Sequence, residues 1–470
     1  MLDALHRRFV RSSAWKWPVA ALALLAAARL GLAPSRRWLS LLLAAMIGAA
    51  VLVRPVLGPF ALVLAALVLP MEFSTGTQVS LNRAALLLAA LLLVWLASSL
   101  VRQRLELASS RVNAPLLGFL ALGLLSLLAG NVLWDPGVPR PHNMLAVQMA
   151  QWAIFALSAG ALWLAGSVIE DQAWLRRLTL TFLGLGGCLA LARLLPVVSG
   201  LIGRFVTVAL NRPPFWLLLT ALAGGQLLFN RQLAANTRRL LVLLLVIVAF
   251  YAFIQLRESV STWVGVAATA GVLIWLRWPR FRWPVILLLT ALSVNGLLQS
   301  AVWEFAGGER EWILSGGSRL ALIERVVQVT MRNPITGLGP ASYRPYANQE
   351  PLAYRRALWI NPKISSHNNY VDLFAQTGVL GLTLFFWFAV ELARLGLRLR
   401  TRFREGFAAG YVNGMLAAGA GSLVIMLLAD WILPFVYNIG FPGFQASVLV
   451  WLFMGGLVAL DHLPDGEAGG

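Results

Sequence analysis

The stretch ISSHNNYVDLFAQTGVLGL, residues 364–382, changes from polar to apolar within a few positions. It opens the apolar run 370–393, which is long enough to cross a membrane as a helix. Similar runs recur along almost the whole chain of 470 residues, of which 59% are hydrophobic and 12% are charged. A soluble protein of this length could not hide so much apolar surface. The sequence therefore predicts an all-α fold, a polytopic bundle of transmembrane helices.

The apolar runs predict about 12–14 transmembrane spans, because one crossing needs about 20 residues. The candidate spans are 18–33, 38–53, 56–70, 84–101, 114–134, 146–168, 178–198, 214–230, 240–256, 260–276, 284–302, 370–393, 407–432 and 441–460. The expected parts of the chain are N-terminal transmembrane helices over 1–303, an extracytoplasmic loop over 304–369, C-terminal transmembrane helices over 370–460 and a cytoplasmic tail over 461–470.

Arginine-rich segments between the spans predict the orientation. The formal net charge is +19, and much of it lies in short segments before the first span and in alternate loops. Cytoplasmic loops of membrane proteins collect basic residues, which explains this charge without nucleic-acid binding. We therefore expect a multi-pass protein of the cytoplasmic (inner) membrane, with the N-terminus inside. The long loop then faces the periplasm or the exterior.

The loop over 304–369 is far longer than an ordinary connection, and loops of that length usually have a function. It contains the segment SRLALIERVVQVTMRNP, whose apolar residues at helical spacing are Leu320, Ile323, Val327 and Met331. We expect an amphipathic helix that lies along the outer membrane surface and uses this apolar face.

Arginines on the expected outer side indicate an anionic substrate. Arg204 and Arg212 flank a span, Arg257 lies at a helix end, and the long loop adds further arginines, Arg319 and Arg344 among them. Arginine near membrane depth is costly unless it faces a cavity or a partner, and its guanidinium group binds phosphate oxygens in pairs. These residues predict a site for a phosphorylated substrate. The alternative is that they reach lipid headgroups or pair with glutamates of the loop.

His367 and Asp430 are the titratable candidates for chemistry. His367 lies in a polar stretch at the start of a span, with Asn368 beside it, and a neutral imidazole can take a proton from an attacking hydroxyl. Asp430 lies in LLADWILPF near an outer helix end, where it could orient His367 or meet an arginine. The structural alternatives are a helix cap for His367 and a helix-packing hydrogen bond for Asp430.

Several kinds of chemistry have no signature in the sequence. No aspartates form an Asp-x-Asp pair, and no His, Cys, Asp or Glu cluster has metal-ligand spacing, so we expect neither a metal nor a cofactor. A Walker phosphate loop and a GxSxG elbow are also absent, which disfavours a nucleotide-driven pump and a serine hydrolase. Arginines would then have to stabilise a phosphate leaving group without a metal.

HNNYVDLFAQTGVLGL resembles the hallmark of the O-antigen ligase/polymerase superfamily, through His367, Asn368, Gly378 and Gly381. NPITGLGPASYR is similar to the Pro-x-x-Gly-x-Gly turn of that family, and GGSRLALIERV to its Gly-x-Arg helix start, which places Arg319. LRESVSTWVGV resembles its Ser-Arg-Gly helix entrance, but Val260 stands where the arginine is expected, so Arg257 takes that place. The likeness covers about 200–460.

The resemblance implies a metal-independent glycosyltransferase. Its donor would be a glycan on undecaprenyl diphosphate, its acceptor a lipid core or another glycan, and membrane lipids would surround it. His367 would be the base for the acceptor hydroxyl, and Arg319 and Arg257 would bind the diphosphate. Asn368, Arg204, Arg212, Arg344 and Asp430 would support substrate binding.

Other functions stay open at this point. A chain polymerase of the same superfamily would share these motifs. A lipid-linked glycan flippase would instead be expected to carry charges through the middle of the membrane and often inverted repeats. A peptidoglycan polymerase of the shape-and-division type would be expected to depend on an outer-loop carboxylate such as Glu304 or Glu309.

Overall fold

The structure is a computed structural model of the chain. It describes residues 51, 53–68, 72–74, 79–101, 103, 107–195, 198–200, 203, 206–311, 317–347, 352–354, 357–360 and 366–463. Two compact units are found, Met1–Ala61 and Leu62–Gly470. In the first, the described residues include the start of helix α4, Leu57–Val68. Everything that follows concerns the second unit.

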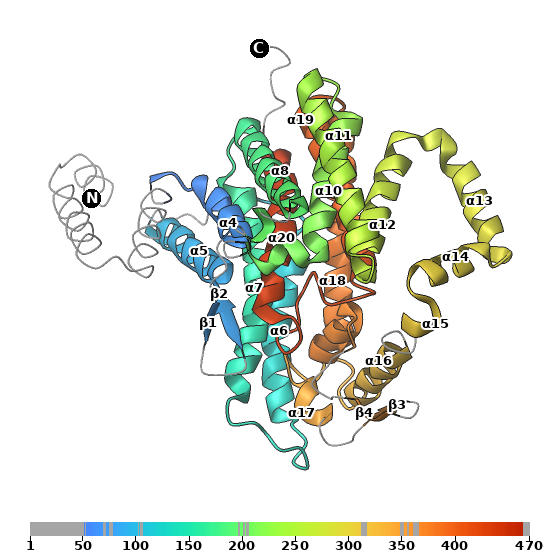
Figure 1. The fold of residues 1–470 in the computed structure, drawn as a ribbon. Coiled ribbons are helices and arrows are strands. Elements are labelled where there is room, and N and C mark those ends of the chain that lie inside the picture. Colours follow the sequence, from blue (N-terminus) through green and yellow to red (C-terminus); the bar gives the residue numbers. More distant parts are fainter. Residues whose placement is uncertain are drawn as a thin grey trace. The chain divides into compact units, whose positions relative to one another are not determined.

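Helices make up most of this unit (Figure 1). The long helices are α5 (Arg83–Val101), α6 (Asn113–Val132), α7 (Met144–Val168), α8 (Gln172–Leu194), α10 (Pro213–Phe229), α11 (Ala235–Phe250), α12 (Val260–Arg277), α13 (Arg282–Val294), α16 (Gly317–Thr330), α18 (Asn369–Arg402), α19 (Gly406–Ile425) and α20 (Gly440–His462). The short helices are η2 (Val208–Asn211), the π-helix η3 (Tyr251–Gln255), η4 (Pro279–Phe281), α14 (Leu297–Phe305), α15 (Gly308–Glu311) and α17 (Tyr343–Ala347). Two antiparallel hairpins pair β1 (Glu72–Ser74) with β2 (Ser80–Asn82), and β3 (Leu352–Tyr354) with β4 (Ala357–Ile360).

The expected polytopic all-α bundle is confirmed. In the described part of the chain, 9 helices are long and apolar enough to cross a membrane. The expected span 284–302 is wrong as a single straight helix, because α13 and α14 meet at 81°. The expected spans 56–70 and 214–230 correspond to short apolar helices, α4 and α10. The spans 18–33 and 38–53 lie outside the described residues, apart from residues 51 and 53.

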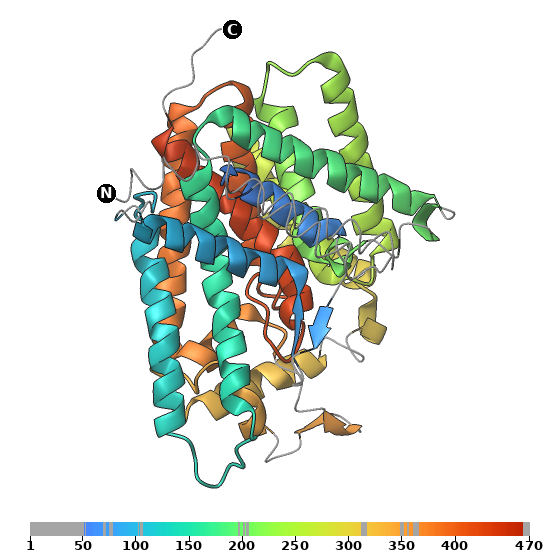
Figure 2. The same ribbon diagram turned by 90° about the vertical axis from the view of Figure 1, so that its left-hand side faces the viewer.

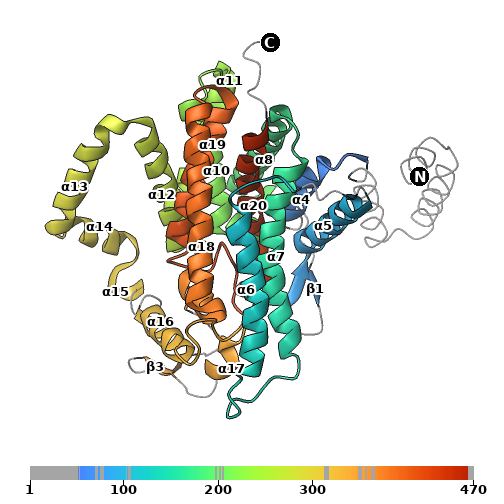
Figure 3. The same cartoon turned by 180° about the vertical axis from the view of Figure 1, so that it is seen from behind.

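Helix α20 is the centre of the bundle. Its apolar window is buried over its whole length, as expected for a helix that is hydrophobic on every side. It packs along α7, and α10 packs along α19 in the same way (Figure 3). Glycines permit these close approaches: a Cβ atom on Gly455 would lie 2.3 Å from the carbonyl oxygen of Leu162, and one on Gly225 would lie 2.3 Å from that of Gly410. Small residues at helix contacts are typical of membrane bundles.

Described arginines of the segments predicted to be cytoplasmic lie at one end of the bundle. Arg400, near the end of α18, donates a hydrogen bond to the carbonyl of Leu276 in α12 at 2.7 Å. Arg231 forms an ion pair with Glu405 at 3.6 Å. This end lies opposite α17 and the turn between α6 and α7 (Figure 2). The bundle therefore has an arginine-rich end and an end that carries the long loop, and the inside–outside orientation stays a prediction.

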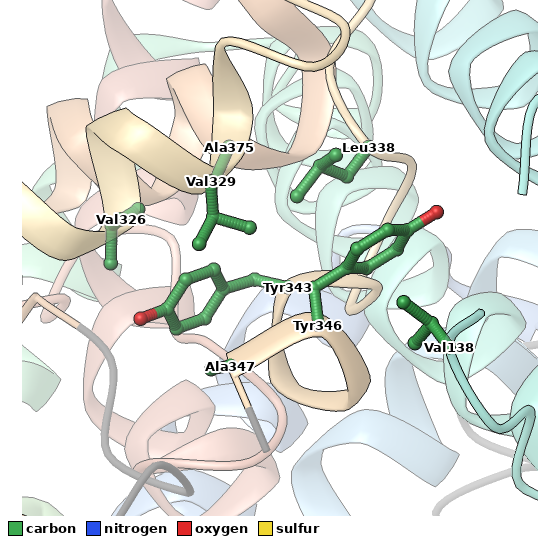
Figure 4. Packing of buried hydrophobic residues seen from close by; sticks show 8 residues of the cluster. All are labelled: Val138, Val326, Val329, Leu338, Tyr343, Tyr346, Ala347 and Ala375. Atoms are coloured by element: carbon green, nitrogen blue, oxygen red, sulfur yellow. The ribbon is translucent and has the colours of Figure 1, made fainter. Parts of the chain in front are cut away.

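The long loop packs onto the other end of the bundle through a small hydrophobic core. Its members are Val138 before α7, Val326 and Val329 of α16, Leu338, Tyr343, Tyr346 and Ala347 in and near α17, and Ala375 of α18 (Figure 4). Polar contacts join the same elements: Gln148 of α7 donates to Ser342 at 2.9 Å, and Asp135 pairs with Arg332. The described part of the loop is thus a folded layer on α6, α7 and α18.

The amphipathic helix of this layer exists, and it packs on the bundle through a different face from the predicted one, most of which stays exposed. Leu322, Val326 and Val329 are buried against α17 and α18, whereas Leu320, Val327 and Met331 are exposed. The helix therefore has two apolar faces, one buried in the protein and one largely exposed. Val326 and Val329 on the buried face pack in one cluster with Tyr343, and contact of the other face with the membrane surface stays a prediction.

A turn of the long loop inserts into a break in α18. Gly378 has φ 66° and ψ −166° within the helix, and this break removes the usual partners of the next two N–H groups. Pro334 and Ile335 replace those partners, because Val379 N–H donates to the Pro334 carbonyl at 2.9 Å and Leu380 N–H to the Ile335 carbonyl at 3.3 Å. The Pro-x-x-Gly-x-Gly turn and the break in α18 therefore form one contact, which we call the joint.

Candidate functional site

Residues 426–439, the α19–α20 loop, form the centre of the candidate site. Most of this loop is buried, although it has no regular secondary structure. A buried loop needs partners for its backbone groups. Gln151 of α7 supplies two: its Nε2 donates to the Pro434 carbonyl at 3.1 Å, and its Oε1 accepts from Val436 N–H at 2.7 Å. The expected span 407–432 is therefore too long, because α19 ends at Ile425 and Asp430 lies in this loop.

Two asparagines connect the loop to the start of α18. Asn368 is the N-cap of the helix, and its Oδ1 accepts from Tyr370 N–H at 3.0 Å and Val371 N–H at 3.2 Å. Asn369 is buried; its Nδ2 donates to the Leu433 carbonyl at 2.7 Å and its Oδ1 accepts from Ile432 N–H at 3.1 Å. Within HNN, the two amides hold the backbone in place and His367 is left to face the site.

His367 is held in a strained, half-buried position. Its φ of 52° lies in the left-handed region, which is uncommon for a residue other than glycine and is found most often at functional sites. Its Nδ1 lies 3.0 Å from Nδ2 of Asn438. Burial, together with the positive charge of Arg319, lowers the pKa of His367 from 6.5 to about 4. The imidazole is therefore neutral at physiological pH, as a proton acceptor must be.

Asp430 is connected to His367 by hydrogen bonds through Asn438. Its Oδ1 accepts from Nδ2 of Asn438 at 2.7 Å, and its Oδ2 accepts from Phe435 N–H at 2.9 Å. Burial raises the pKa of Asp430 from 3.8 to about 6, although these hydrogen bonds and the charge of Arg212 oppose that shift. The prediction that Asp430 could orient His367 thus gains a physical route, through Asn438.

Three arginines from three elements reach the same loop. Arg212, the residue before α10, places its guanidinium 4.9 Å from the ring centre of Trp431. Arg319 of α16 donates to the Leu428 carbonyl at 3.3 Å. Arg344 of α17 lies 4.2 Å from the ring centre of Tyr437. The α19–α20 loop therefore gathers three arginines that are far apart in sequence, and Asn438 of the same loop contacts His367.

Arg212 also retains hydrogen-bonding capacity. Its Nε is buried and makes no hydrogen bond within the described part of the chain. Burial lowers its pKa, while the negative charge of Asp430 opposes that effect. A buried donor without a partner is costly, and a bound anion could relieve that cost.

Two more arginines, Arg257 and Arg204, were predicted to belong to the site. Arg257 donates to the carbonyl of Phe305 at 2.9 Å and lies 4.8 Å from the ring centre of the same residue, so it holds the end of α14. The start of α12, a few residues further on, reaches the site through Ser261, whose Oγ accepts from Nε1 of Trp431 at 3.0 Å. Arg204 lies outside the described residues.

Trp431, Tyr437 and Asn438 belong to the site but were not singled out from the sequence. A signal for them is present in DWILPFVYNIG, where polar residues, proline and glycine interrupt two apolar runs. Within the described residues, no group of His, Cys, Asp or Glu side chains could hold a metal ion. The positive charge that the described residues bring to this loop comes from arginine side chains.

An apolar cavity of about 250 Å³ continues from the loop into the bundle. Met426 and Ile432 line it at the loop. Leu276 of α12 and Leu397 of α18 line it toward the arginine-rich end. The cavity thus begins at two residues of the α19–α20 loop and has an almost wholly apolar lining.

Residues 240–386 match the family model described as O-antigen ligase. The match covers about a third of the chain and includes α12, the described part of the long loop, His367 and the break in α18. No curated protein matches the chain. Arg212 and the α19–α20 loop lie outside the matched segment, so the structure brings them to it.

Proposed function

We propose that this membrane protein is a glycosyltransferase of the O-antigen ligase/polymerase type, because residues 240–386 match the O-antigen ligase family model. It transfers a glycan from undecaprenyl diphosphate to an acceptor hydroxyl at the outer face of the cytoplasmic membrane. The proposal rests on one observation: Arg212, Arg319 and Arg344 all contact the α19–α20 loop, and Asn438 of this loop contacts His367. A lipid-core acceptor, as in a ligase, is the first choice.

The arginines bind the diphosphate of the donor. A guanidinium group can bind two phosphate oxygens at once, and water competes little for this contact where the guanidinium group is buried. Arg212 has a buried N–H without a partner, and Arg319 lies close enough to His367 to lower its pKa. A diphosphate between these side chains would lie beside the imidazole.

The apolar cavity suits a short part of the donor's lipid chain. Its lining is almost wholly hydrocarbon, and it starts at Met426, whose carbonyl accepts from Asn369 N–H at 2.8 Å. A polyprenyl chain in the cavity and a diphosphate at the arginines would require one continuous molecule. The presence of an apolar cavity at the same loop as the arginines supports a lipid-linked donor over a soluble sugar nucleotide.

The reaction needs one proton acceptor and one stabilised leaving group. His367 takes the proton of the acceptor hydroxyl, and the oxygen attacks the anomeric carbon of the donor glycan. The bond between that carbon and the phosphate oxygen breaks, and undecaprenyl diphosphate leaves with its charge stabilised by arginines. The proton of the acceptor hydroxyl moves to His367 and is then released to water. No step requires a metal ion.

Two other functions remain as competitors. A chain polymerase of the same superfamily would use this site with a second lipid-linked glycan as acceptor. A flippase would move the donor across the bilayer without forming a glycosidic bond. The polar residues of the site lie together at one end of the bundle, and this favours an enzyme at one membrane surface.

A reconstituted transfer reaction should separate these three functions. Purified protein in liposomes is incubated with an undecaprenyl-diphosphate oligosaccharide and EDTA, with a lipid-core acceptor or without one. We expect transfer to the lipid core, which a gel shows as a shifted band, because arginines replace the metal. A ladder without added acceptor would identify a polymerase. Movement of the donor across the bilayer without any product would overturn the enzyme proposal.

Donor binding should weaken when an arginine of the site loses its charge. A hydrogen bond to a charged group contributes about 1.5–3 kcal/mol, so Arg212→Gln and Arg319→Gln should each weaken binding of undecaprenyl diphosphate about 10–100-fold. Equilibrium binding in nanodiscs measures this loss. Arg140→Gln is the matched control, because Arg140 contacts Trp134 at the same end of the bundle, away from the loop. Unchanged affinity in both site variants would place the diphosphate elsewhere.

A further inference from the structure

Asn438 holds the side chains of Asp430 and His367 with the same nitrogen. Its Nδ2 lies 2.7 Å from Oδ1 of Asp430 and 3.0 Å from Nδ1 of His367. An amide NH₂ group has two N–H bonds to donate, and an ionised carboxylate can only accept. With Asp430 ionised, the two N–H bonds are therefore directed to the carboxylate and to Nδ1. His367 must accept at Nδ1, so its own proton is on Nε2.

We propose that Asn438 is a positioning residue that sets the tautomer of His367 according to the charge of Asp430. While Asp430 is ionised, the imidazole presents an N–H at Nε2 and cannot take a proton there. When Asp430 is protonated, the imidazole presents a lone pair at Nε2 and can act as a base. This inference rests on the proposed function for its consequence, but the tautomer itself can be measured without any transfer reaction.

The hydrogen bonds that form when Asp430 is protonated follow from the same contacts. An Asp430 carboxyl that carries a proton must donate it, and its neighbour in the hydrogen-bond chain is Asn438. The amide then turns so that Oδ1 faces both Asp430 and Nδ1 of His367. Nδ1 must now carry the imidazole proton in order to donate to Oδ1. Overall, Asp430 takes up one proton from water, and the imidazole stays neutral because its proton exchanges from Nε2 to Nδ1 through solvent.

The charges around Asp430 make the two states close in energy. The groups that face it or its loop from the packed elements are Arg212 before α10, His367 before α18, Arg319 of α16, Arg344 of α17 and Tyr437 of the loop itself. From α7, α12 and α20 come the neutral side chains Gln151, Ser261 and Trp451. Burial favours the protonated carboxyl and Arg212 favours the ionised one, so a change at Arg212 shifts the balance.

Donor binding is such a change. A diphosphate at Arg212 brings negative charge toward Asp430 and shares the arginine that stabilises its ionised form. Asp430 then takes up a proton more readily, and Asn438 turns His367 into a base. The base would form when the donor is in place, so the free enzyme would keep His367 in the unreactive tautomer.

The pH range of the switch follows from the two pKa values. Asp430 has a pKa of about 6, so its protonated fraction grows as the pH falls through that value. The pKa of His367, about 4, is lower, so the imidazole stays neutral across the change. The tautomer should therefore invert near pH 6 rather than disappear into the doubly protonated form.

Nitrogen NMR of a protein with one histidine tests the proposal. His6, His142 and His462 are replaced by glutamine, and ¹⁵N-labelled histidine reports which nitrogen of His367 carries the proton. We expect the proton on Nε2 at about pH 8 and on Nδ1 at about pH 5. Addition of undecaprenyl diphosphate should move the inversion to higher pH. In the Asp430→Asn variant, the tautomer should no longer depend on pH, and Asn438→Leu should remove the same dependence.

Each outcome has one meaning. A tautomer that is the same at both pH values in the otherwise unchanged protein would overturn the proposal, as would an inversion that persists in Asp430→Asn. Protein without transfer activity that still shows the inversion would contradict the proposed function alone. Full transfer activity without the inversion would contradict the inference alone. Thermal unfolding of Asn438→Leu and Asp430→Asn shows whether the variants are folded, and the Asp430→Asn spectrum decides the question if Asn438→Leu is not.

Discussion

The His367→Ala variant should lose glycan transfer by about 10²–10⁴-fold and keep its affinity for undecaprenyl diphosphate, because a positioned general base contributes a factor of that size. The imidazole is neutral, since burial and Arg319 lower its pKa to about 4, and it lies beside the arginines proposed to hold the donor. The arginines remain in the variant, so binding should change little. Transfer rate and donor affinity are measured separately in liposomes and nanodiscs.

The backbone at His367 requires a second variant. Its φ of 52° is unfavourable for alanine, so loss of activity in His367→Ala could reflect a displaced loop. Asparagine tolerates the left-handed region better, and His367→Asn should lose transfer equally while unfolding at the temperature of the parent. His142→Ala, in the turn between α6 and α7, is the control at the same end of the bundle and should keep full activity. Turnover at the parental rate in His367→Asn would exclude His367 as the base.

Hydropathy predicted the bundle well because the membrane imposes a simple constraint. Every backbone polar group within the bilayer must be satisfied inside its own segment, so a spanning helix is a long apolar run. Helices α6, α7 and α20 lie where the runs predicted them. The failure at 284–302 has a local reason, since the sequence SVNG at 293–296 allows a turn in which Gly296 has φ 71°. An average over a window conceals such a break.

The candidate site was predictable where one residue carries the signal and not where packing creates it. His367 was singled out by its polar setting at a helix start, and Arg212, Arg319, Arg344 and Asp430 by their charge in an apolar chain; all five reach the α19–α20 loop or lie in it. Arg257, singled out in the same way, contacts the end of α14 instead, and Arg204 lies outside the described residues. Asn438 was missed because an amide beside a membrane span has many possible roles. Its importance depends on two partners that lie 8 and 71 positions away in the chain. Distance in sequence hides such a contact from any reading of local pattern.

Asn368 shows a different limit of sequence reasoning. The resemblance of the His-Asn motif implied that Asn368 supports substrate binding, and that role stays a prediction. Its carboxamide oxygen caps α18, and its Nδ2 donates to the Leu427 carbonyl at 3.0 Å. These contacts place it as the residue that fixes the backbone next to His367. An asparagine is favoured at an N-cap for the same reason that it is favoured in a polar site, so the sequence alone could not separate the two roles.

Gly378→Ala should destabilise the protein by at least about 3 kcal/mol, because two penalties act at one position. The φ of 66° and ψ of −166° belong to a region that is essentially restricted to glycine. A Cβ atom there would also lie 2.1 Å from the carbonyl oxygen of Ile335, which accepts the hydrogen bond of Leu380. The substitution must therefore push the loop turn out of the break in α18.

The same joint can be tested from its other side and against a neutral glycine. Gly337→Ala should have a similar cost, since its Cβ would lie 2.5 Å from the nitrogen of Thr377 and its φ is 76°. Gly184→Ala in α8 is the control, because a Cβ there meets nothing within 4 Å and alanine favours helix. The unfolding temperature in detergent should fall for Gly378→Ala and Gly337→Ala. It should stay the same or rise for Gly184→Ala. Trypsin should also cut the displaced turn at Arg332, which now pairs with Asp135. If Gly378→Ala unfolds at the temperature of the parent and resists this cleavage, the turn does not depend on the break in α18, and the two motifs are not one joint.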